Sequence, residues 1–260
     1  MPVPDEYHDH EPGEQPTSVL ILPGFTIVDC VTPALTLDLI KHFVNPSVTT
    51  MTPLGCDRPG PISDESSESE TGEDHHLQQP QQQQQEEEQQ KTSTPLRSRS
   101  CPHAAVILLC SQRTRDVRCG QSAPLLRREF ERHLRPLGLY RELDDERPGG
   151  VGIYFVSHVG GHKYAANVIV YRRRDFDWYR KDAATASASA ENESDTDPDQ
   201  EGEREKEQKD EGASQGIWLA RVRPEDCENI VRYTVLQGKV VKPGHQLRGG
   251  FDREKGLISW

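Results

Sequence analysis

The chain of 260 residues contains few of the residues that a packed core or a membrane helix needs. Hydrophobic residues make up 33% of it and aromatic residues 6%, whereas about half of a fully packed chain is apolar. No stretch approaches the ~18 consecutive apolar residues of a transmembrane helix, so we expect no membrane partner. The first 16 residues have neither an apolar segment nor an arginine-rich, acid-poor composition, so no targeting signal is visible there.

Cysteine is also scarce. Six cysteines are too few for a secreted disulfide scaffold of this length, which favours an intracellular compartment with free thiols. The chain has no Cys-x-x-Cys motif, so dithiol exchange of the thioredoxin type lacks its usual sequence. We interpret four of the cysteines as buried and inert: Cys30, Cys56, Cys101 and Cys227. A disulfide between Cys30 and Cys56 remains an open alternative.

The shortage of apolar residues is concentrated in acidic, low-complexity tracts. Residues 61–100 and 182–216 together hold 21 acidic and 6 basic residues, and residues 1–16 hold five acidic and no basic ones. Such segments bury too little apolar surface to offset the entropy of ordering them. We therefore expect a disordered tail at 1–16, a disordered linker at 61–100 and a disordered insertion at 182–216. The remaining residues hold 25 basic and 17 acidic side chains, although the whole chain has a net charge of -12.

The other residues form two predicted units. Residues 17–60 offer one strand and one short helix, which cannot close a core alone, so we predict the remnant of an N-terminal lobe that packs on another part of the chain. Residues 101–260 form the second unit. Its apolar run at 104–109 is typical of a central strand that is covered on both faces.

Turn and capping residues divide the second unit into strands and helices. Strands are predicted at 151–157, 164–171 and 217–222, one helix is predicted to begin at Ser122 and Pro124, and another at Pro224. The order β-α-β-β-β-α predicts an α/β fold, with a thioredoxin-like layer of helices on a central sheet.

Four residues with metal-binding side chains follow the ends of two predicted strands. Cys110 ends the first strand and Cys119 lies in the loop after it, while His158 and His162 enclose a Val-Gly-Gly loop after the second strand. The two glycines disfavour a helix there. Because α/β sheets place ligands at strand ends, we expect the four side chains to meet. Two thiolates and two imidazoles complete a tetrahedral donor set for zinc or for an iron-sulfur centre.

The spacing of these residues does not choose between the two metals. Zinc fingers have two to four residues between their cysteines and about twelve before their histidines. Here eight residues separate the cysteines and 38 separate Cys119 from His158. A Rieske centre mixes cysteine and histidine in each loop, which this chain does not. Zinc and a [2Fe-2S] cluster both remain open on spacing alone.

Several segments resemble a known family. C-SQRTRDVR-C, SHVGGHKYAANVIVY, IWLARVRPED and the late LRGG are similar to the sucrase/ferredoxin-like family of thioredoxin-like ferredoxins, most of all to its altered inheritance of mitochondria branch. The resemblance covers residues 101–181 and 217–260, and PTSVLILPGFTIV resembles the end of that family's N-terminal lobe. Family members usually carry a longer N-terminal lobe with a cysteine-rich start, which this chain does not contain.

The resemblance implies a [2Fe-2S] cluster held by Cys110 and Cys119 on one iron and by His158 and His162 on the other. It also implies electron transfer or thiol-redox homeostasis with a redox partner protein, and a mitochondrial location, with the cytoplasm as the alternative. The other functions considered are a zinc-bound interaction module and a thiol oxidoreductase that uses free cysteines.

Charged residues near these segments have simpler interpretations as well. Arg113, Arg115 and Arg118 would favour thiolate in the cysteine loop or form a solvated surface, and Asp116 is expected to cap the loop backbone. The basic run at 172–174 is predicted to be a solvated strand end or a docking site for an acidic redox partner, and no nucleic-acid partner is expected.

Overall fold

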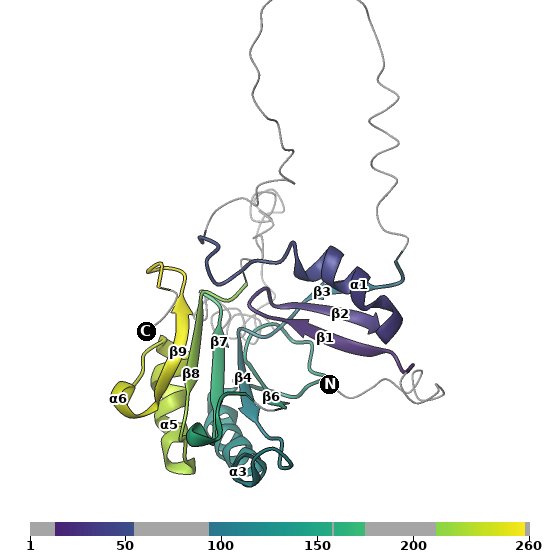
Figure 1. Cartoon of the computed structure of the whole chain (residues 1–260). Helices are drawn as coiled ribbons and strands as arrows, with labels where there is room; N and C mark the ends of the chain where they lie inside the picture. The colour runs from purple at the N-terminus through teal and green to yellow at the C-terminus, as the bar shows by residue number, and fades with distance from the viewer. Residues whose placement is uncertain (1–13, 55–93, 158, 175–211, 258–260) are drawn as a thin grey trace, which may run out of the picture.

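The computed structural model describes residues 14–54, 94–157, 159–174 and 212–257, and of His162 it describes the backbone alone (Figure 1). These residues form an α/β structure with one sheet of three strands and one of six. Most of the two tracts predicted to be disordered, and the tail at 1–16 up to residue 13, lie outside the described residues. Among the described residues, no helix is both long and apolar enough to cross a membrane.

The large sheet has the strand order β5-β6-β4-β7-β8-β9. β4 lies inside it, parallel to β6 and antiparallel to β7, and each later pair is antiparallel. The strands are β4 (Ala105–Cys110), β5 (Tyr140–Arg141), β6 (Val151–Val156), β7 (Val168–Arg172), β8 (Gln215–Leu219) and β9 (Leu247–Asp252).

Side chains of β4 alternate between two separate cores. Ile107 and Leu109 belong to a core that includes Phe130 of the long helix, whereas Val106 lies in a second core with Phe25 from the N-terminal part of the chain. Successive residues of a strand point to opposite faces, so β4 is covered on both sides. The prediction of a central, doubly covered strand from its uninterrupted apolar run is confirmed.

Helices cover one face of the large sheet, and Figure 1 shows α3 and α5 side by side there. The helical segments are α3 (Val117–Leu134), η5 (Arg135–Leu137), η6 (His162–Tyr164), η8 (Pro224–Asp226), α5 (Cys227–Asn229), η9 (Ile230–Val235) and α6 (Pro243–Gln246). η8, α5 and η9 run on without a break. They bury the residues expected from the sequence, which include Cys227, Ile230 and Val235.

The small sheet has the order β1-β2-β3 and is antiparallel throughout. Its elements are β1 (Thr17–Ile21), β2 (Thr26–Val31) and β3 (Arg97–Ser100), with η2 (Pro33–Leu35), α1 (Thr36–Leu39) and η3 (Ile40–Val44) after β2. Two predictions change here. β2 was not expected, and β3 lies within 61–100, which was predicted to be a linker.

The N-terminal part of the chain packs on the second core, as its small size required. Phe25 is fully buried, and its carbonyl oxygen accepts a hydrogen bond from the backbone nitrogen of Cys101 at 2.7 Å. The guanidinium of Arg173 lies 4.6 Å from the centre of the Phe25 ring and donates to the carbonyl oxygen of Cys101 at 2.8 Å. Arg173 is therefore a structural residue. The docking role predicted for the run at 172–174 does not apply to it.

Candidate dithiol site at the loop edge of the large sheet

Five strands place their ends at one edge of the large sheet. Val156, Cys110, Val168, Leu219 and Leu247 are paired in neighbouring registers across β6, β4, β7, β8 and β9. β4, β6 and β8 end in this row, and β7 and β9 begin in it. We call this side of the sheet the loop edge, because the segments that leave and enter these strands meet there. The sequence predicts that the candidate side chains meet at strand ends, and β4 and β6, which precede them, both end at this edge.

Cys110 and Cys119 lie together at the loop edge. Cys110 is the last residue of β4; its backbone nitrogen donates to the carbonyl oxygen of Asn167 at 3.1 Å and its Sγ to the carbonyl oxygen of Ser157 at 3.4 Å. Cys119 lies in the first turn of α3, and its thiol is close enough to the thiol of Cys110 for Cys110 to raise its pKa. Both residues are 1% exposed. The structure therefore brings the two predicted cysteines into contact.

Cys119 is helical rather than in a loop because the N-cap of α3 lies six residues earlier than predicted, at Asp116 instead of Ser122. Asp116 is the N-cap: its Oδ1 accepts from the backbone nitrogen of Arg118 at 3.0 Å, which confirms the capping role expected for it. Pro124 lies inside the helix, although Ser122 and Pro124 were expected to start it. Ser122 instead donates its hydroxyl to the carbonyl oxygen of Arg118 at 2.7 Å. Both Asp116 and Ser122 have side chains that can cap a helix, and Asp116 is the N-cap of α3.

Burial determines the protonation of Cys119. Loss of solvent raises the pKa of its thiol to about 12, and the nearby Cys110 thiol adds to the shift. The backbone hydrogen bond from Asn167 acts in the opposite direction and is weaker. Cys119 is therefore a protonated thiol at neutral pH. The expected stabilisation of thiolate by nearby arginines does not dominate, and Arg118 forms a 2.8 Å ion pair with Asp116 instead.

The histidine loop is described only in part. His158 lies outside the described residues, and so does the side chain of His162. Between them, Gly160 has a positive φ of 74°, and an added Cβ would lie 3.0 Å from the Trp218 ring. The side-chain amide of Asn167 donates to the carbonyl oxygen of Val159 at 2.9 Å. The loop thus packs against Asn167, whose backbone contacts both cysteines.

The function predicted from the sequence needs correction at this point. Among the described side chains, no group of three or more His, Cys, Asp or Glu residues is placed to hold a metal ion. The described site is a pair of thiols, one of them firmly protonated. An iron-sulfur redox protein is therefore the wrong prediction for this chain, and the zinc-bound module has no more support. That Cys110, Cys119, His158 and His162 form one site stays a prediction, because two of these side chains are not described.

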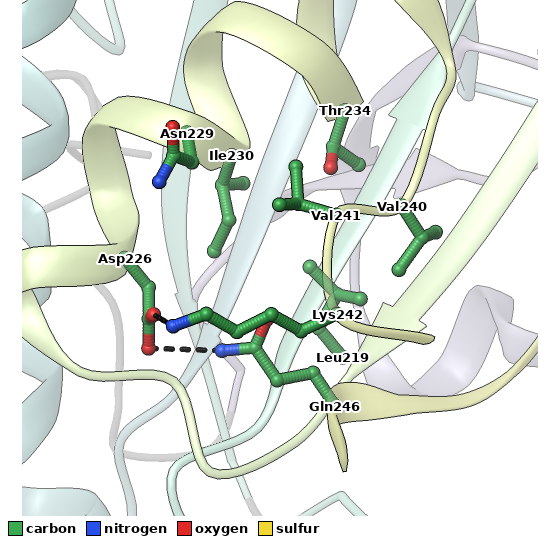
Figure 2. A pocket seen from close by; sticks show the side chains of 9 residues that line it. All are labelled: Leu219, Asp226, Asn229, Ile230, Thr234, Val240, Val241, Lys242 and Gln246. Carbon is green, nitrogen blue, oxygen red and sulfur yellow. Dashed lines mark hydrogen bonds and ion pairs between the residues drawn. The ribbon is translucent and has the colours of Figure 1, made fainter. Parts of the chain in front are cut away.

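A hollow lies between η8, α5 and η9 on one side and the segment 240–246 on the other, and the carboxylate that lines it is already paired (Figure 2). The Asp226 carboxylate accepts from Lys242 Nζ at 2.6 Å, from Gln246 Nε2 at 2.8 Å and from the backbone nitrogen of Arg223 at 3.0 Å. Figure 2 shows Lys242 and Gln246 converging on this carboxylate. These contacts tie η8 to α6 and so fix where β9 begins. We assign the hollow a structural role.

The family can now be stated from comparison with known proteins. The sucrase/ferredoxin-like family matches residues 3–249. The chain belongs to the sucrase/ferredoxin-like family. The resemblance stated from the cysteine and histidine segments is thereby confirmed.

Named relatives match parts of this family member. Actin patches distal protein 1 of Saccharomyces cerevisiae is 54% identical over 69 residues, which are 26% of this chain and 22% of the relative. Altered inheritance of mitochondria protein 32 of Clavispora lusitaniae is 30% identical over 140 residues, 54% of this chain and 33% of the relative. Its namesake in Meyerozyma guilliermondii is 27% identical over 137 residues, 53% and 32% of the two chains. The chain thus matches a third or less of the length of these relatives.

No solved structure matches the chain. The α/β class is established by the two sheets and their helices, whereas the thioredoxin-like assignment and the domain boundaries at 17–60 and 101–260 stay predictions.

Proposed function

We propose that this chain is a redox-responsive binding module, in which Cys110 and Cys119 convert between a dithiol and a disulfide and thereby control how the loop edge binds a partner protein. The observation that carries the proposal is the contact between two thiols from different elements, one at the end of β4 and one in the first turn of α3. A bond between them would join these two elements directly.

The other described cysteines lie elsewhere in the fold, and Cys30 of β2 is only partly buried, which differs from the buried position predicted for it. Cys227 belongs to the core under the helices and Cys101 to the core under the N-terminal sheet. Burial raises the pKa of the Cys227 thiol, and its Sγ donates to the carbonyl oxygen of Arg223 at 3.7 Å. The inert role predicted for Cys101 and Cys227 agrees with this burial. Cys56 lies outside the described residues.

The reaction is thiol–disulfide exchange with a low-molecular-weight disulfide such as oxidised glutathione. The two protein thiols lose two protons and two electrons and form one S–S bond, while the oxidant's S–S bond breaks and yields two thiols. Attack requires a thiolate, and the raised pKa of Cys119 keeps its thiolate scarce at neutral pH. The exchange should be slow, which favours a switch over a rapid catalytic oxidoreductase.

Oxidation would alter the loop edge through hydrogen bonds that the thiols now make. A disulfide removes the thiol proton that Cys110 donates to the carbonyl oxygen of Ser157, the residue after β6. It also joins the two neighbouring sulfur atoms by a covalent bond. The segment between Cys110 and α3 and the loop after β6 are the parts that would readjust. They are the parts that a partner would contact at this edge.

We also place this function with mitochondria. The support is the name altered inheritance of mitochondria protein 32, which the relatives from Clavispora lusitaniae and Meyerozyma guilliermondii share. Fractionation of cells that express the tagged full chain tests this placement, and co-purification with the cytosol alone would contradict it.

The first prediction tests the switch. Full-length protein equilibrated in glutathione buffers, quenched with acid and alkylated after denaturation should show one Cys110–Cys119 disulfide by peptide mass spectrometry. Cys227→Ala should leave this bond unchanged, and Cys110→Ser should abolish it. The proposal would be rejected if both thiols were still fully alkylated at a potential of about -180 mV, which is typical of an oxidising cellular compartment.

A further inference from the structure

The loop edge is rich in positive charge. Its segments at 111–116, 157–167, 220–223 and 247–250 contain a single acidic residue, Asp116. Arg223 in these segments pairs with Glu225 at 3.6 Å, and the other five Lys and Arg residues make up what we call the basic edge: Arg113, Arg115, Lys163, Arg221 and Arg248. Since β4, β7, β8 and β9 all have an end in this row, residues far apart in the sequence are gathered on one side of the molecule.

Three of these residues surround one aromatic ring. The guanidinium of Arg248 lies 3.3 Å from the centre of the Tyr164 ring, that of Arg221 lies 5.7 Å from it, and Lys163 Nζ lies 5.6 Å from it. The backbone nitrogen of Arg221 also donates to the carbonyl oxygen of Tyr164 at 3.4 Å. The ring holds three like charges together, because its negative face attracts cations.

Among the residues that the structure describes, no carboxylate pairs with a charge of the basic edge. Within the described ranges none of its five residues forms an ion pair, and four of them, all but Arg221, are exposed. Arg118, beside them, is already bound to Asp116. Elsewhere arginines have carboxylate partners, as in Arg127–Glu131 at 2.7 Å and Arg147–Asp145 at 2.6 Å. Like charges held together without partners favour an anionic ligand.

We propose that the basic edge is the docking surface for a protein that presents a cluster of Asp and Glu side chains. Carboxylates would pair with Arg248, Arg221 and Lys163 around Tyr164, and with Arg113 and Arg115 on the other side of the thiols. The proposal deepens the proposed function, since it identifies the chemistry of the partner that the dithiol controls.

The position of the basic edge connects it with the thiols. Tyr164 and Asn167 are three residues apart, and the carbonyl oxygen of Asn167 accepts from the backbone nitrogen of Cys110 at 3.1 Å. Val222, next to Arg221, donates from its backbone nitrogen to the carbonyl oxygen of Ala166 at 3.2 Å. A change at the thiol pair therefore reaches the charged residues through a few backbone hydrogen bonds.

An acidic protein fits this surface better than a nucleic acid. Single-stranded nucleic acids bind by stacking bases on exposed aromatic rings. Tyr164 is half-buried, and Arg248 covers its ring at 3.3 Å, so this face is not open to a base. The charges come from segments that leave or enter several strands and do not follow one helix or strand. Carboxylates need no stacking surface and pair with guanidinium groups directly.

The second prediction tests this surface with the full chain and a fluorescein-labelled polyglutamate peptide, by fluorescence anisotropy. The reduced protein should bind the peptide, and binding should weaken as salt is added, because salt screens exposed charges. The double variant Arg221→Glu/Arg248→Glu should bind at least roughly tenfold more weakly, whereas Arg248→Lys should bind nearly as the parent does, since it keeps the charge. Unfolding temperatures of all variants establish that they are folded.

Matched controls make the result specific. Arg128 on α3 and Lys41 in η3 are exposed and lie away from the basic edge, so Arg128→Glu/Lys41→Glu introduces the same charge change elsewhere. An equal loss of binding in this control would overturn the proposal, because it would reflect net charge alone. So would an absence of binding to the peptide, or tighter binding of single-stranded DNA of equal length through Arg248.

The same assay separates the two proposals. Peptide binding that differs between reduced and oxidised protein supports both of them. Peptide binding that depends on the basic edge but is the same in both redox states supports the docking surface and overturns the redox control. If the Cys110–Cys119 disulfide forms but the protein does not bind the peptide, the redox change of the thiols is supported and the docking surface is overturned.

Discussion

Asp116 shows at the scale of one residue how a local interaction sets the site. It is 8% exposed, caps α3 and pairs with Arg118, so it fixes the turn that carries Cys119 next to Cys110. The sequence allowed the capping role of Asp116 to be predicted but not its consequence. Ser122 and Pro124 form an equally good start signal, and only packing of the first helical turn against β4 decides between the two.

The third prediction concerns this cap. Asp116→Ala should lower the free energy of unfolding by about 1 kcal/mol, because the amide nitrogen of Arg118 loses its acceptor. It should also speed alkylation of Cys119, since the first turn of α3 opens more often. Asp144→Ala, which removes an exposed carboxylate away from the helix, is the control. Urea denaturation measures the first effect and timed alkylation the second; equal stabilities of the two variants would contradict the capping role.

At the scale of elements, the strong apolar runs were predictable and the weak or short segments were not. β4, β6 and the helix after Pro224 follow from hydrophobic periodicity alone. β3 has the sequence RSRS, with every residue exposed, and it forms only because β2 offers it a hydrogen-bonding edge. A strand of that kind depends on its neighbour, and no pattern within it indicates a strand.

The start of β7 was not predicted at this scale either. The predicted strand at 164–171 begins at Val168, and the residues before it contain the 3₁₀ turn η6 instead. The neighbouring ends of β4 and β6 were expected to bring Cys110 close to the loop after β6, and the structure pairs these two strand ends. The start of α3 was not expected: the sequence placed its N-cap six residues too late, and the true helix terminus brings Cys119 to Cys110.

The fourth prediction concerns the close contact between α3 and the loop before it. A Cβ on Gly120 would lie 2.5 Å from Arg113 Cβ and 2.8 Å from its Cα. In an open helix, Gly→Ala gains about 1 kcal/mol of helix propensity. Here the clash with backbone should outweigh that gain, and Gly120→Ala should destabilise the protein by about 1 to 3 kcal/mol. Gly244→Ala in α6, where no atom lies within 4 Å of the added Cβ, should be tolerated. Thermal unfolding compares the two; a stabilised Gly120→Ala protein would contradict the predicted clash.

At the scale of the whole molecule, the two sheets meet around His103, which is 2% exposed. Its Nε2 lies 3.0 Å from the hydroxyl of Tyr154 on β6, and Ile27 of β2 and Arg99 of β3 line the same hollow. Burial lowers the pKa of His103 to about 4, and the charges of Arg141, Arg173 and Arg99 act in the same direction, while Asp145 opposes them. His103 is therefore neutral where the N-terminal sheet packs on the large sheet.

The fifth prediction follows from this neutral histidine. The unfolded chain binds a proton at His103 below pH 6.5, whereas the folded chain binds it only below about 4, so stability should fall as pH drops through this window. The loss from this one residue is of order 3 kcal/mol, from the 1.36 kcal/mol that corresponds to each pKa unit. Asp145, whose pKa is lowered to about 2, contributes only below its ordinary value of 3.8. Its effect is therefore separable from that of His103.

His103→Gln provides the comparison, because glutamine keeps a polar side chain but does not titrate. Whatever stability it loses at pH 7, its free energy of unfolding should change less between pH 6.5 and 4.5 than that of the parent protein, as urea denaturation at each pH would measure. Equal slopes in the two proteins would mean that His103 protonates without disturbing the fold. A shallower slope in the variant would mean that the uncharged imidazole of His103 stabilises the fold where the two sheets meet, so that its protonation in acid weakens the fold there.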